Sequence, residues 1–430
     1  MTVLLKNVNI IDMVDDGSYT GSILIDESSG TISDVVRGDA PAGEHTTGEY
    51  DCDGLTVAPG FIDAHSHLNY REIHEWYQFE IQKSLPEATV DSVINAALLL
   101  RRGFTTIRDC GSRAGLAVAV RNALAAGDLL GPRAQVAGQI VSTPGGLGDN
   151  HPSHVFAPNE YGSSQAVLVS EPWAARSVVR RQLKDGVDWI KATLTGTGSN
   201  PNVPAERNDL PEEIFAAVMA EANEQGVRVI AHVESLVSVK RAARHGAASV
   251  EHGIFIDDEA VDLLLEHDVV LVPTLAQYTT YTEQGLDFGR PRRSVDAHRR
   301  IHDDHVRSIR LAYERGVPIA AGGDAGGAHF PQGSAAREMS TLVDLVGMSP
   351  AEALRTGTVN GAGLLGLSDR IGTIEPGKVA DLVVLGTNPL DDIHALDHAD
   401  TIVAVFQNGK MVPPPPFQQP RLTPIGAATG

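Results

Sequence analysis

Two histidines one residue apart end an apolar stretch near the start of the chain. The stretch reads APGFIDAHSHLN over residues 58–69, with His65 and His67 on either side of Ser66. In a β-strand, residues i and i+2 point to the same side, so both imidazoles face one point. Two neutral imidazoles that share a point are typical ligands of a metal ion. A chance His-x-His pair is the alternative, and the rest of the chain must decide between the two.

The elements that would position these histidines recur along the middle of the chain. Short β-branched runs alternate there with stretches such as PEEIFAAVMAEANEQG, which carry apolar residues at i, i+3 and i+4. Besides the run before His65, the β-branched runs lie at 105–111, 134–142, 187–196, 227–235, 248–253, 269–275 and 317–327. Eight β-α repeats predict an α/β fold, namely a parallel (β/α)8 TIM barrel, with a doubly wound sheet as the alternative.

Polar residues stand at the ends of several of these predicted strands. In a barrel of this kind, the active site lies at the carboxyl ends of the strands. Those ends carry His65, His67, Lys191, His232, His252 and Asp324. Imidazole and carboxylate suit Zn, Mn, Fe or Co, and the set is large enough for two ions. The lysine has two explanations: a carbamate formed with CO2 could bridge the ions, or Lys191 is an ordinary ion-paired lysine.

The two ends of the chain have a different character. Residues 2–57 read as short strands with turns, and residues 371–412 repeat that pattern, with an Asn-Gly hairpin signal at 408–409. We therefore predict a small β-sandwich domain from residues 1–57 and 371–412, beside a catalytic barrel domain at 58–370. Residues 413–430 are Pro-rich and show no core pattern, so they predict an extended or disordered tail.

Composition restricts the class of protein. The 430 residues carry a formal net charge of −21, which argues against nucleic acid or an anionic membrane as a partner, since both need a basic surface. There are two cysteines, Cys52 and Cys110, and neither a signal-peptide pattern nor an apolar run of about 18 residues is seen. We expect a cytoplasmic protein without disulfides.

Together these motifs resemble the amidohydrolase superfamily over almost the whole chain. PGFIDAHSHL is similar to its first-strand motif, EHG at 251–253 to its sixth-strand motif, GGDAGG at 322–327 to its eighth-strand motif, and GTIEPGKVADLVVL to its C-terminal β-sandwich return. GVDWIKATLTG resembles the lysine strand of the two-metal, prolidase-like and imidazolonepropionase-like branch. Mononuclear deaminases of the superfamily have no such lysine.

The resemblance implies a role for each ligand candidate. The first-strand histidine pair would bind the more buried ion, His232 and His252 would bind the second, and Lys191, as N6-carboxylysine, would bridge both. Asp324 would bind the first ion, hold a metal-bridging hydroxide and carry the catalytic proton. Zinc is the expected metal, with a CO2-derived carbamate on Lys191. Similar proteins are commonly oligomers, so we expect a homo-oligomer.

The expected reaction is metal-dependent hydrolysis of an amide-type C–N bond in a small molecule. An N-acyl amino acid or a dipeptide of the Xaa-Pro kind is the first substrate class. Hydrolysis of an aryl amide (ochratoxin-like amides included), urea or carbamate is the alternative. A cyclic imide hydrolase or deaminase is disfavoured by Lys191. A non-catalytic scaffold comes last, because every ligand position is filled.

The chain departs from this branch in two loops. Many relatives carry Gly-Gly-His-Gly after the third strand; here Leu147 stands at the place of that histidine, which would tolerate a less polar substrate. His151 is either its substitute or a loop histidine that faces water. Glu234 follows the fifth strand where several relatives have tyrosine. It could bind a cationic or hydrogen-bond-donating substrate, or cap the next helix.

Four further substrate contacts are predicted on loops that follow the strands: Tyr70, Arg71, Tyr278 and His329. Arg71 could clamp a substrate carboxylate with two hydrogen bonds. The histidines of HRRIHDDHVR at 298–307 have helical spacing but no strand end beside them. We therefore expect a solvated helix face there.

Overall fold

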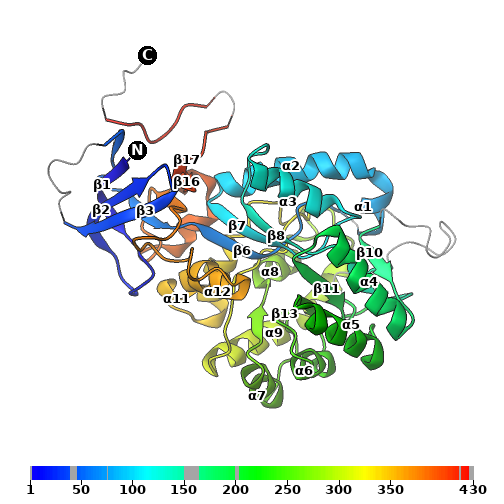
Figure 1. Ribbon diagram of the computed structural model, residues 1–430. Helices are drawn as coiled ribbons and strands as arrows, with labels where there is room; N and C mark the ends of the chain where they lie inside the picture. Colours follow the sequence, from blue (N-terminus) through cyan, green and yellow to red (C-terminus); the bar gives the residue numbers. More distant parts are fainter. Residues whose placement is uncertain are drawn as a thin grey trace.

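A computed structural model describes residues 2–38, 46–74, 76–149, 164–198, 203–415 and 418–425. Figure 1 shows a β-rich part at one side, which contains both the first and the last strands, next to a larger part in which helices surround parallel strands. Within the described residues, the helices are too short or too polar to cross a lipid bilayer.

One mixed sheet contains strands from both ends of the chain. Its strands are β1 (Thr2–Ile10), β2 (Tyr19–Asp26), β3 (Thr31–Arg37), β4 (Gly48–Asp51), β5 (Thr56–Pro59), β15 (Leu382–Leu385), β16 (Ile402–Gln407) and β17 (Lys410–Met411). They follow the order β17-β16-β15-β5-β1-β2-β3, with β4 paired to β1. Leu5, Ile23, Val57, Leu382 and Phe406 are buried together on this sheet. The two chain ends therefore share a sheet, whereas the second layer of a sandwich stays a prediction.

The hairpin between β16 and β17 turns at Asn408 and Gly409. Both residues have positive φ, 48° and 77°, and Gln407 pairs with Lys410 across the turn. Positive φ at both central residues is the geometry of a type I′ turn, which asparagine and glycine adopt at low cost. The Asn-Gly hairpin prediction is confirmed.

Two parallel sheets occupy the middle of the chain. The first contains β6 (Phe61–Ser66), β7 (Phe104–Asp109) and β8 (Arg133–Val136); the second contains β9 (Ile140–Ser142), β10 (Ala166–Leu168), β11 (Trp189–Thr193), β12 (Arg228–Val233), β13 (Ser249–His252) and β14 (Val270–Val272), in the order β10-β9-β11-β12-β13-β14. Every residue of β6, β7, β11 and β13 is buried. Parallel strands are buried in this way because helices cover the sheet. The predicted α/β class is confirmed.

The covering helices lie between these strands and after β14 in the chain. They are α1 (Trp76–Gln82), α2 (Leu85–Arg101), α3 (Leu116–Ala126), α4 (Pro172–Asp185), α5 (Glu212–Gln225), α6 (Leu236–Arg244), α7 (Asp258–Glu266), α8 (Leu275–Gln284), α9 (Arg292–Glu314), α10 (Arg337–Thr341), α11 (Pro350–Arg355) and α12 (Gly361–Leu365). Short π-helices at Leu342–Val346 and Thr356–Asn360 and 3-10 turns at Ile393–Asp397 and Ala399–Thr401 complete the set. Side chains define several helix starts: Ser84 and Glu87 form a capping box on α2, and Asp257 caps α7.

Two of the predicted strands differ from the structure. The third, predicted at 134–142, is divided into β8 and β9. The eighth, predicted at 317–327, has no regular strand, although the Ala320 N–H donates to the Leu271 carbonyl and the Ala64 N–H to the Ala321 carbonyl. The segment contains Gly322, and a Cβ at this position would lie 2.6 Å from the Cβ of His65. The segment approaches β6 so closely that only glycine fits there.

The described part of the C-terminal tail has no helix or strand, and it packs on the terminal sheet. Leu422 is only 5% exposed and joins the core cluster of that sheet. The Ile425 N–H donates to the Glu49 carbonyl at 2.6 Å, and Arg421 donates to the Ile402 carbonyl at 3.0 Å. One apolar residue and a few backbone contacts suffice for this docking, which is too weak a signal to read in a Pro-rich segment.

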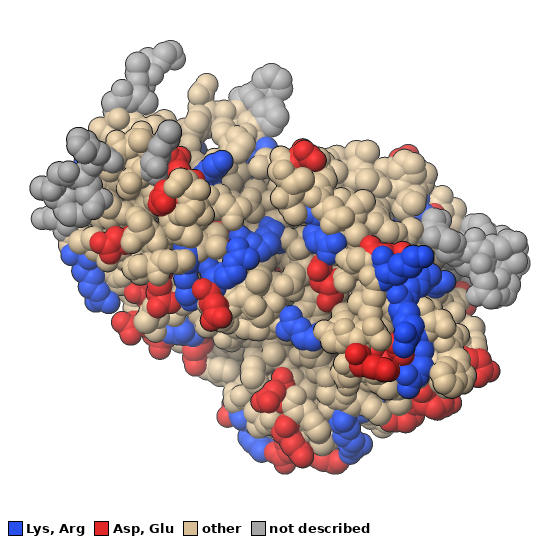
Figure 2. Space-filling view, viewed as in Figure 1, with Lys and Arg blue, Asp and Glu red and all other residues tan. Residues whose placement is uncertain are grey.

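Acidic and basic side chains are mixed over the face of the molecule seen in Figure 2. Ion pairs join neighbouring helices: Arg315, which caps the C-terminus of α9, contacts Asp258 and Asp262 of α7, each at 2.7 Å. Such exposed pairs add little stability, about 0–1 kcal/mol each. Cys52 and Cys110 are both buried and unbridged.

Candidate metal site

The six predicted ligands come together at the carboxyl ends of the parallel strands. Strand β6 carries His65 and leads into His67, β11 carries Lys191, β12 carries His232, β13 ends in His252, and Asp324 follows the irregular eighth segment. All six line one cavity of about 80 Å³. The other described lining residues are Tyr70, Ile140, Leu147, Gly148, Gln165, Thr193, Thr197 and Tyr278.

Distances within the cavity separate the ligands into two groups. The Nε2 atoms of His65 and His67 lie 3.7 and 3.5 Å from Oδ1 of Asp324. The ring centroids of His232 and His252 are 4.5 Å apart, and the His252 ring is 5.3 Å from that of His65. Within each group the candidate donor atoms lie no more than 4.8 Å apart, which is close enough to share an ion after small side-chain movements.

Hydrogen bonds fix the tautomers of the first-strand histidines. Nδ1 of His65 lies 2.6 Å from Oε2 of Glu251, and Nδ1 of His67 lies 2.7 Å from the Gly111 carbonyl. Both oxygens accept only, so each ring must donate from Nδ1. The Nε2 lone pairs of His65 and His67 are therefore free and face Asp324. An outer hydrogen bond of this kind is the usual partner of a metal-binding histidine.

The second histidine pair is fixed in the same way. Nε2 of His232 donates to the Gly196 carbonyl at 2.9 Å, which leaves the Nδ1 lone pair free. Nδ1 of His252 lies 2.7 Å from the Thr274 hydroxyl, and that hydroxyl donates its own proton to the Pro273 carbonyl. The Thr274 oxygen must therefore accept from His252, whose Nε2 lone pair is free. Each of the four rings thus offers one nitrogen to an ion.

Burial keeps these rings neutral. Burial, with a smaller contribution from the nearby charge of Lys191, lowers the pKa of both His67 and His232 to about 3. Burial also raises the pKa of Asp324 to about 8, and the Lys191 charge opposes that rise. Neutral imidazole is the form that binds a metal ion.

Lys191 is the unusual member of the cavity. Its side chain is 2% exposed, and among the described residues Nζ has no hydrogen-bond partner. A buried polar group without a partner is costly, so a native structure that keeps one has a reason for it. The alternative explanation was an ordinary ion-paired lysine, but the described residues provide no ion-pair partner for Lys191.

A buried ion pair supports the ligands from behind. Arg108 and Glu251 are both fully buried and lie 2.9 Å apart, and Glu251 in turn holds His65. The Arg108 Nε–H also donates to the Ala64 carbonyl at 2.7 Å. Sequence reasoning missed this pair. The available signal was a charged residue inside each of two buried strands, TTIRDC and SVEHG, since a buried charge needs a partner.

Comparison with known proteins identifies the family. The model of the amidohydrolase family matches residues 56–412. The chain belongs to the amidohydrolase family. A solved Xaa-Pro dipeptidase with bound methionine is 30% identical, covers 96% of this chain and 100% of its own, and superposes with a TM-score of 0.86. Ochratoxinase of Aspergillus niger is 27% identical over 76% of this chain and 68% of its own length. Imidazolonepropionase of Sphingopyxis alaskensis is 29% identical, over 80% and 81% of the two chains.

Two of the predicted substrate contacts of this amidohydrolase line the cavity. Tyr70 stacks on His67 with a centroid distance of 4.3 Å, and Tyr278 packs 5.6 Å from the His252 ring. Glu234 lies behind Tyr278: it accepts the tyrosine hydroxyl at 2.5 Å and the Gly198 N–H at 2.8 Å. Its carboxylate is thus used within the amidohydrolase itself. It does not cap the following helix α6, which Ser235 caps instead.

The remaining candidates lie elsewhere. Arg71 is 3.6 Å from Asp91 and does not line the cavity. His329 is also outside the cavity wall, where Arg290 donates to its Nδ1 at 3.3 Å. His151 falls outside the described residues. Of the five candidates that lie among the described residues, Tyr70 and Tyr278 therefore line the cavity of this amidohydrolase.

The helix face at 298–307 is buried, so the prediction of a solvated face is wrong. His298 and His305 of α9 are fully buried, and burial lowers the pKa of each to about 3. The His305 Nε2–H donates to the His252 carbonyl at 2.9 Å, and His298 stacks on Tyr281 at 3.9 Å. Helix α9 thus packs against the strand end that carries a metal-ligand candidate.

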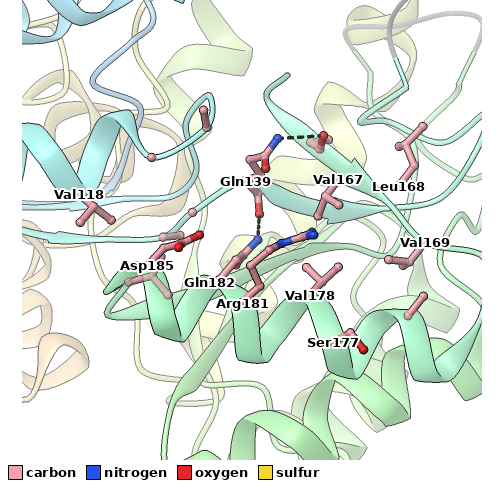
Figure 3. Close-up of a pocket in the computed structure, with 17 residues that line it drawn as sticks. Val118, Gln139, Val167, Leu168, Val169, Ser177, Val178, Arg181, Gln182 and Asp185 are labelled. Atoms are coloured by element: carbon pink, nitrogen blue, oxygen red, sulfur yellow. Dashed lines mark hydrogen bonds between the residues drawn. The ribbon is translucent and has the colours of Figure 1, made fainter. Parts of the chain in front are cut away.

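A larger groove of about 640 Å³ lies elsewhere in the amidohydrolase, between α3, α4 and β10 (Figure 3). Val118, Val167 and Val178 contribute apolar surface, while Gln182 donates to the Gln139 carbonyl at 2.6 Å. The described residues that line it include no histidine. The smaller cavity with the six ligand candidates is therefore the candidate active site.

Proposed function

We propose that this amidohydrolase binds two divalent metal ions and hydrolyses an amide-type C–N bond of an N-acyl amino acid or dipeptide. One observation carries the proposal: the buried amine of Lys191 has no partner among the described residues and lies among four neutral histidines. The 30% identity to an Xaa-Pro dipeptidase over nearly the whole chain supports the substrate class.

The proposal includes the architecture that holds these ligands. The two parallel sheets and the segment at 317–324 would close a (β/α)8 barrel at 58–370, beside a β-sandwich domain from 1–57 and 371–412. Hydrogen bonds from the irregular segment to Leu271 on one side and Ala64 on the other support closure. A closed barrel brings first-strand and eighth-strand ligands together, which explains why the Asp324 N–H donates to the His65 carbonyl.

Each donor fits a place in a two-ion centre. The free Nε2 atoms of His65 and His67, with Asp324, would hold one ion, and His232 and His252 the other. Addition of the Lys191 amine to CO2 forms an N–C bond and releases a proton to solvent. The resulting carbamate is an anion with two oxygens, which would reach both ions. Zinc is the first expected metal, and Mn, Fe or Co suits the same donors.

Two ions, when bound, polarise the scissile carbonyl and lower the pKa of a water molecule. The chain supplies the proton transfers. The Asp324 side chain is 15% exposed and faces the cavity, so it can take the proton of the attacking water and deliver it to the leaving nitrogen. Amide cleavage needs that second transfer, because an unprotonated nitrogen is a poor leaving group.

A second substrate class is favoured by the apolar side of the cavity. Ile140 and Leu147 line it, and Lys191 is the single cationic side chain among its described lining residues. Such a wall suits a neutral aryl amide, urea or carbamate, and the similarity to ochratoxinase agrees with an amide of that kind.

Metal content per chain tests the proposal first, on protein grown with added metal and bicarbonate. Two ions together with a carbamate mass on Lys191 would support the two-metal hydrolase, and N-acyl amino acids, dipeptides and aryl ureas would then be compared by kcat/KM. One ion and an unmodified lysine would overturn it and redirect attention to imide or deaminase chemistry. The Leu147→His variant separates the substrate classes, since it should favour the more polar substrates.

A further inference from the structure

Thr274 adopts a backbone conformation that its side chain disfavours. It lies between β14 and α8 with φ of 54°, in the left-handed region. A β-branched residue is a genuine outlier there, because its Cβ substituents clash with the backbone. His252, whose ring meets the Thr274 hydroxyl, is also left-handed, with φ of 69°. Strain of this kind persists where the surrounding structure enforces it, and it is concentrated at functional sites.

Contacts from two other helices hold these strained residues in place. The buried carboxylate of Glu338, on α10, accepts the N–H groups of Leu275 and Ala276 at 2.9 and 2.7 Å. His305, on α9, holds the carbonyl of His252 at 2.9 Å. The Thr274 hydroxyl and the His252 ring therefore face each other on two fixed pieces of backbone.

The hydroxyl has no freedom to reverse its role. It donates to the Pro273 carbonyl at 2.7 Å, so it can only accept from Nδ1 of His252 at 2.7 Å. A half-turn of the imidazole would place a carbon opposite the hydroxyl and forfeit that hydrogen bond. The contact therefore selects one tautomer and one orientation of the ring, both of which direct the free Nε2 into the cavity.

We propose that Thr274 is a positioning residue that orients His252 for the second metal ion. This inference rests on the proposed function in one respect, namely that His252 is a ligand. It adds a residue that touches neither metal nor substrate and that acts through the ring of His252. Without the hydroxyl, Nδ1–H would have no acceptor and both ring orientations would become populated, so the second ion would bind more weakly.

Metal titration of the EDTA-treated full chain with Zn2+ against a chromophoric chelator tests this inference. Thr274→Val keeps the shape and removes the hydroxyl; it should weaken one of the two ions by about 10–100-fold, the usual effect of losing an outer hydrogen bond, and leave the other unchanged. Thr274→Ser keeps the hydroxyl and should restore wild-type affinity. Thr358→Val is the matched control, because it removes a buried hydroxyl-to-carbonyl bond at 2.7 Å from a residue that does not line the cavity.

Thr274→Gly separates positioning from a role in the turn. Glycine accepts the left-handed conformation without strain, so this variant should fold well and still lose affinity for one ion. Wild-type affinity for both ions in the glycine and valine variants would overturn the inference. A wild-type chain that takes up fewer than two ions would instead overturn the proposed function. The absorption spectrum of Co2+ at the second site provides a readout independent of activity, and its change in the valine variant should be reversed in the serine variant.

Discussion

Replacing Lys191 by methionine should move the stabilities of the metal-free and metal-loaded protein in opposite directions. Methionine has a similar length and no polar atom to satisfy. In the metal-free protein, the buried amine, which has no acceptor among the described residues, costs about 1–3 kcal/mol, so its removal should stabilise the fold by about that amount. In the loaded protein, the lost bridge should release at least one ion. Each ion present at about 1,000 times its Kd contributes about 4 kcal/mol, so the loaded variant should become less stable.

The assay compares unfolding of four samples by calorimetry: wild type and Lys191→Met, each loaded with zinc and bicarbonate or stripped by EDTA. We expect the stripped variant to unfold above the stripped wild type and the loaded variant to unfold below the loaded wild type. Lys184→Met is the matched control, since Lys184 is an exposed residue of α4. It should leave both midpoints unchanged.

A variant that is less stable than the wild type in both states would refute this reasoning. It would mean that Lys191 has a stabilising partner even without metal, and the bridging role would lose its main support. A loaded variant that keeps two ions and normal turnover would contradict the bridge directly.

Three further outcomes are expected. Asp324→Asn should keep most of the bound metal but lose turnover, because an amide cannot take up the proton; equal loss of metal and kcat, measured on one preparation, would make Asp324 a ligand only. Burial lowers the pKa of His298 to about 3, whereas the unfolded chain gains that proton near pH 6.5. The free energy of unfolding should therefore fall as the pH is lowered from about 6.5 to 3. In His298→Gln this fall, measured by urea unfolding at several pH values, should be smaller, and a fall equal to that of the wild type would contradict the prediction. Leu422→Ala should lower the free energy of unfolding of the terminal sheet by about 2–4 kcal/mol and leave the metal content unchanged. An unchanged unfolding temperature in calorimetry would mean that the tail does not dock on the sheet.

The convergence of the six ligand candidates on one cavity could be predicted from sequence, because parallel strands place their carboxyl ends at one edge. His65, Lys191 and His252 each stand near the end of a short β-branched run, and that regularity is local in the chain. The outer contacts could not be predicted in the same way. Arg108 and Glu251 lie 143 residues apart, and nothing local in either strand identifies its partner. The irregularity of the eighth segment was also missed. Gly322 of this segment lies close to His65 of β6, and a contact between residues so far apart in the chain leaves no local pattern in the sequence.

Helix α9 shows a different reason for failure. Its polar composition indicated a solvated face, yet its buried residues include Val295, His298, His305 and Ile309. These positions recur at helical spacing if the histidines are counted with the apolar residues. A neutral imidazole packs well on aromatic rings, as His298 does on Tyr281. The pattern was present in the sequence, and the assumption that histidine is polar concealed it.

The shared terminal sheet has a consequence for synthesis of the chain. Strand β5 pairs with β15, and Pro59 and Leu382 are partners across that junction. At about 5–20 residues per second, a ribosome needs on the order of tens of seconds to make the residues between them. Throughout that time β5 lacks its partner β15, and an unpaired apolar edge can associate with other chains. Dependence on chaperones during translation should therefore be concentrated in the first strands. A circular permutant in which these strands are made last should shorten the time between synthesis of β5 and synthesis of β15.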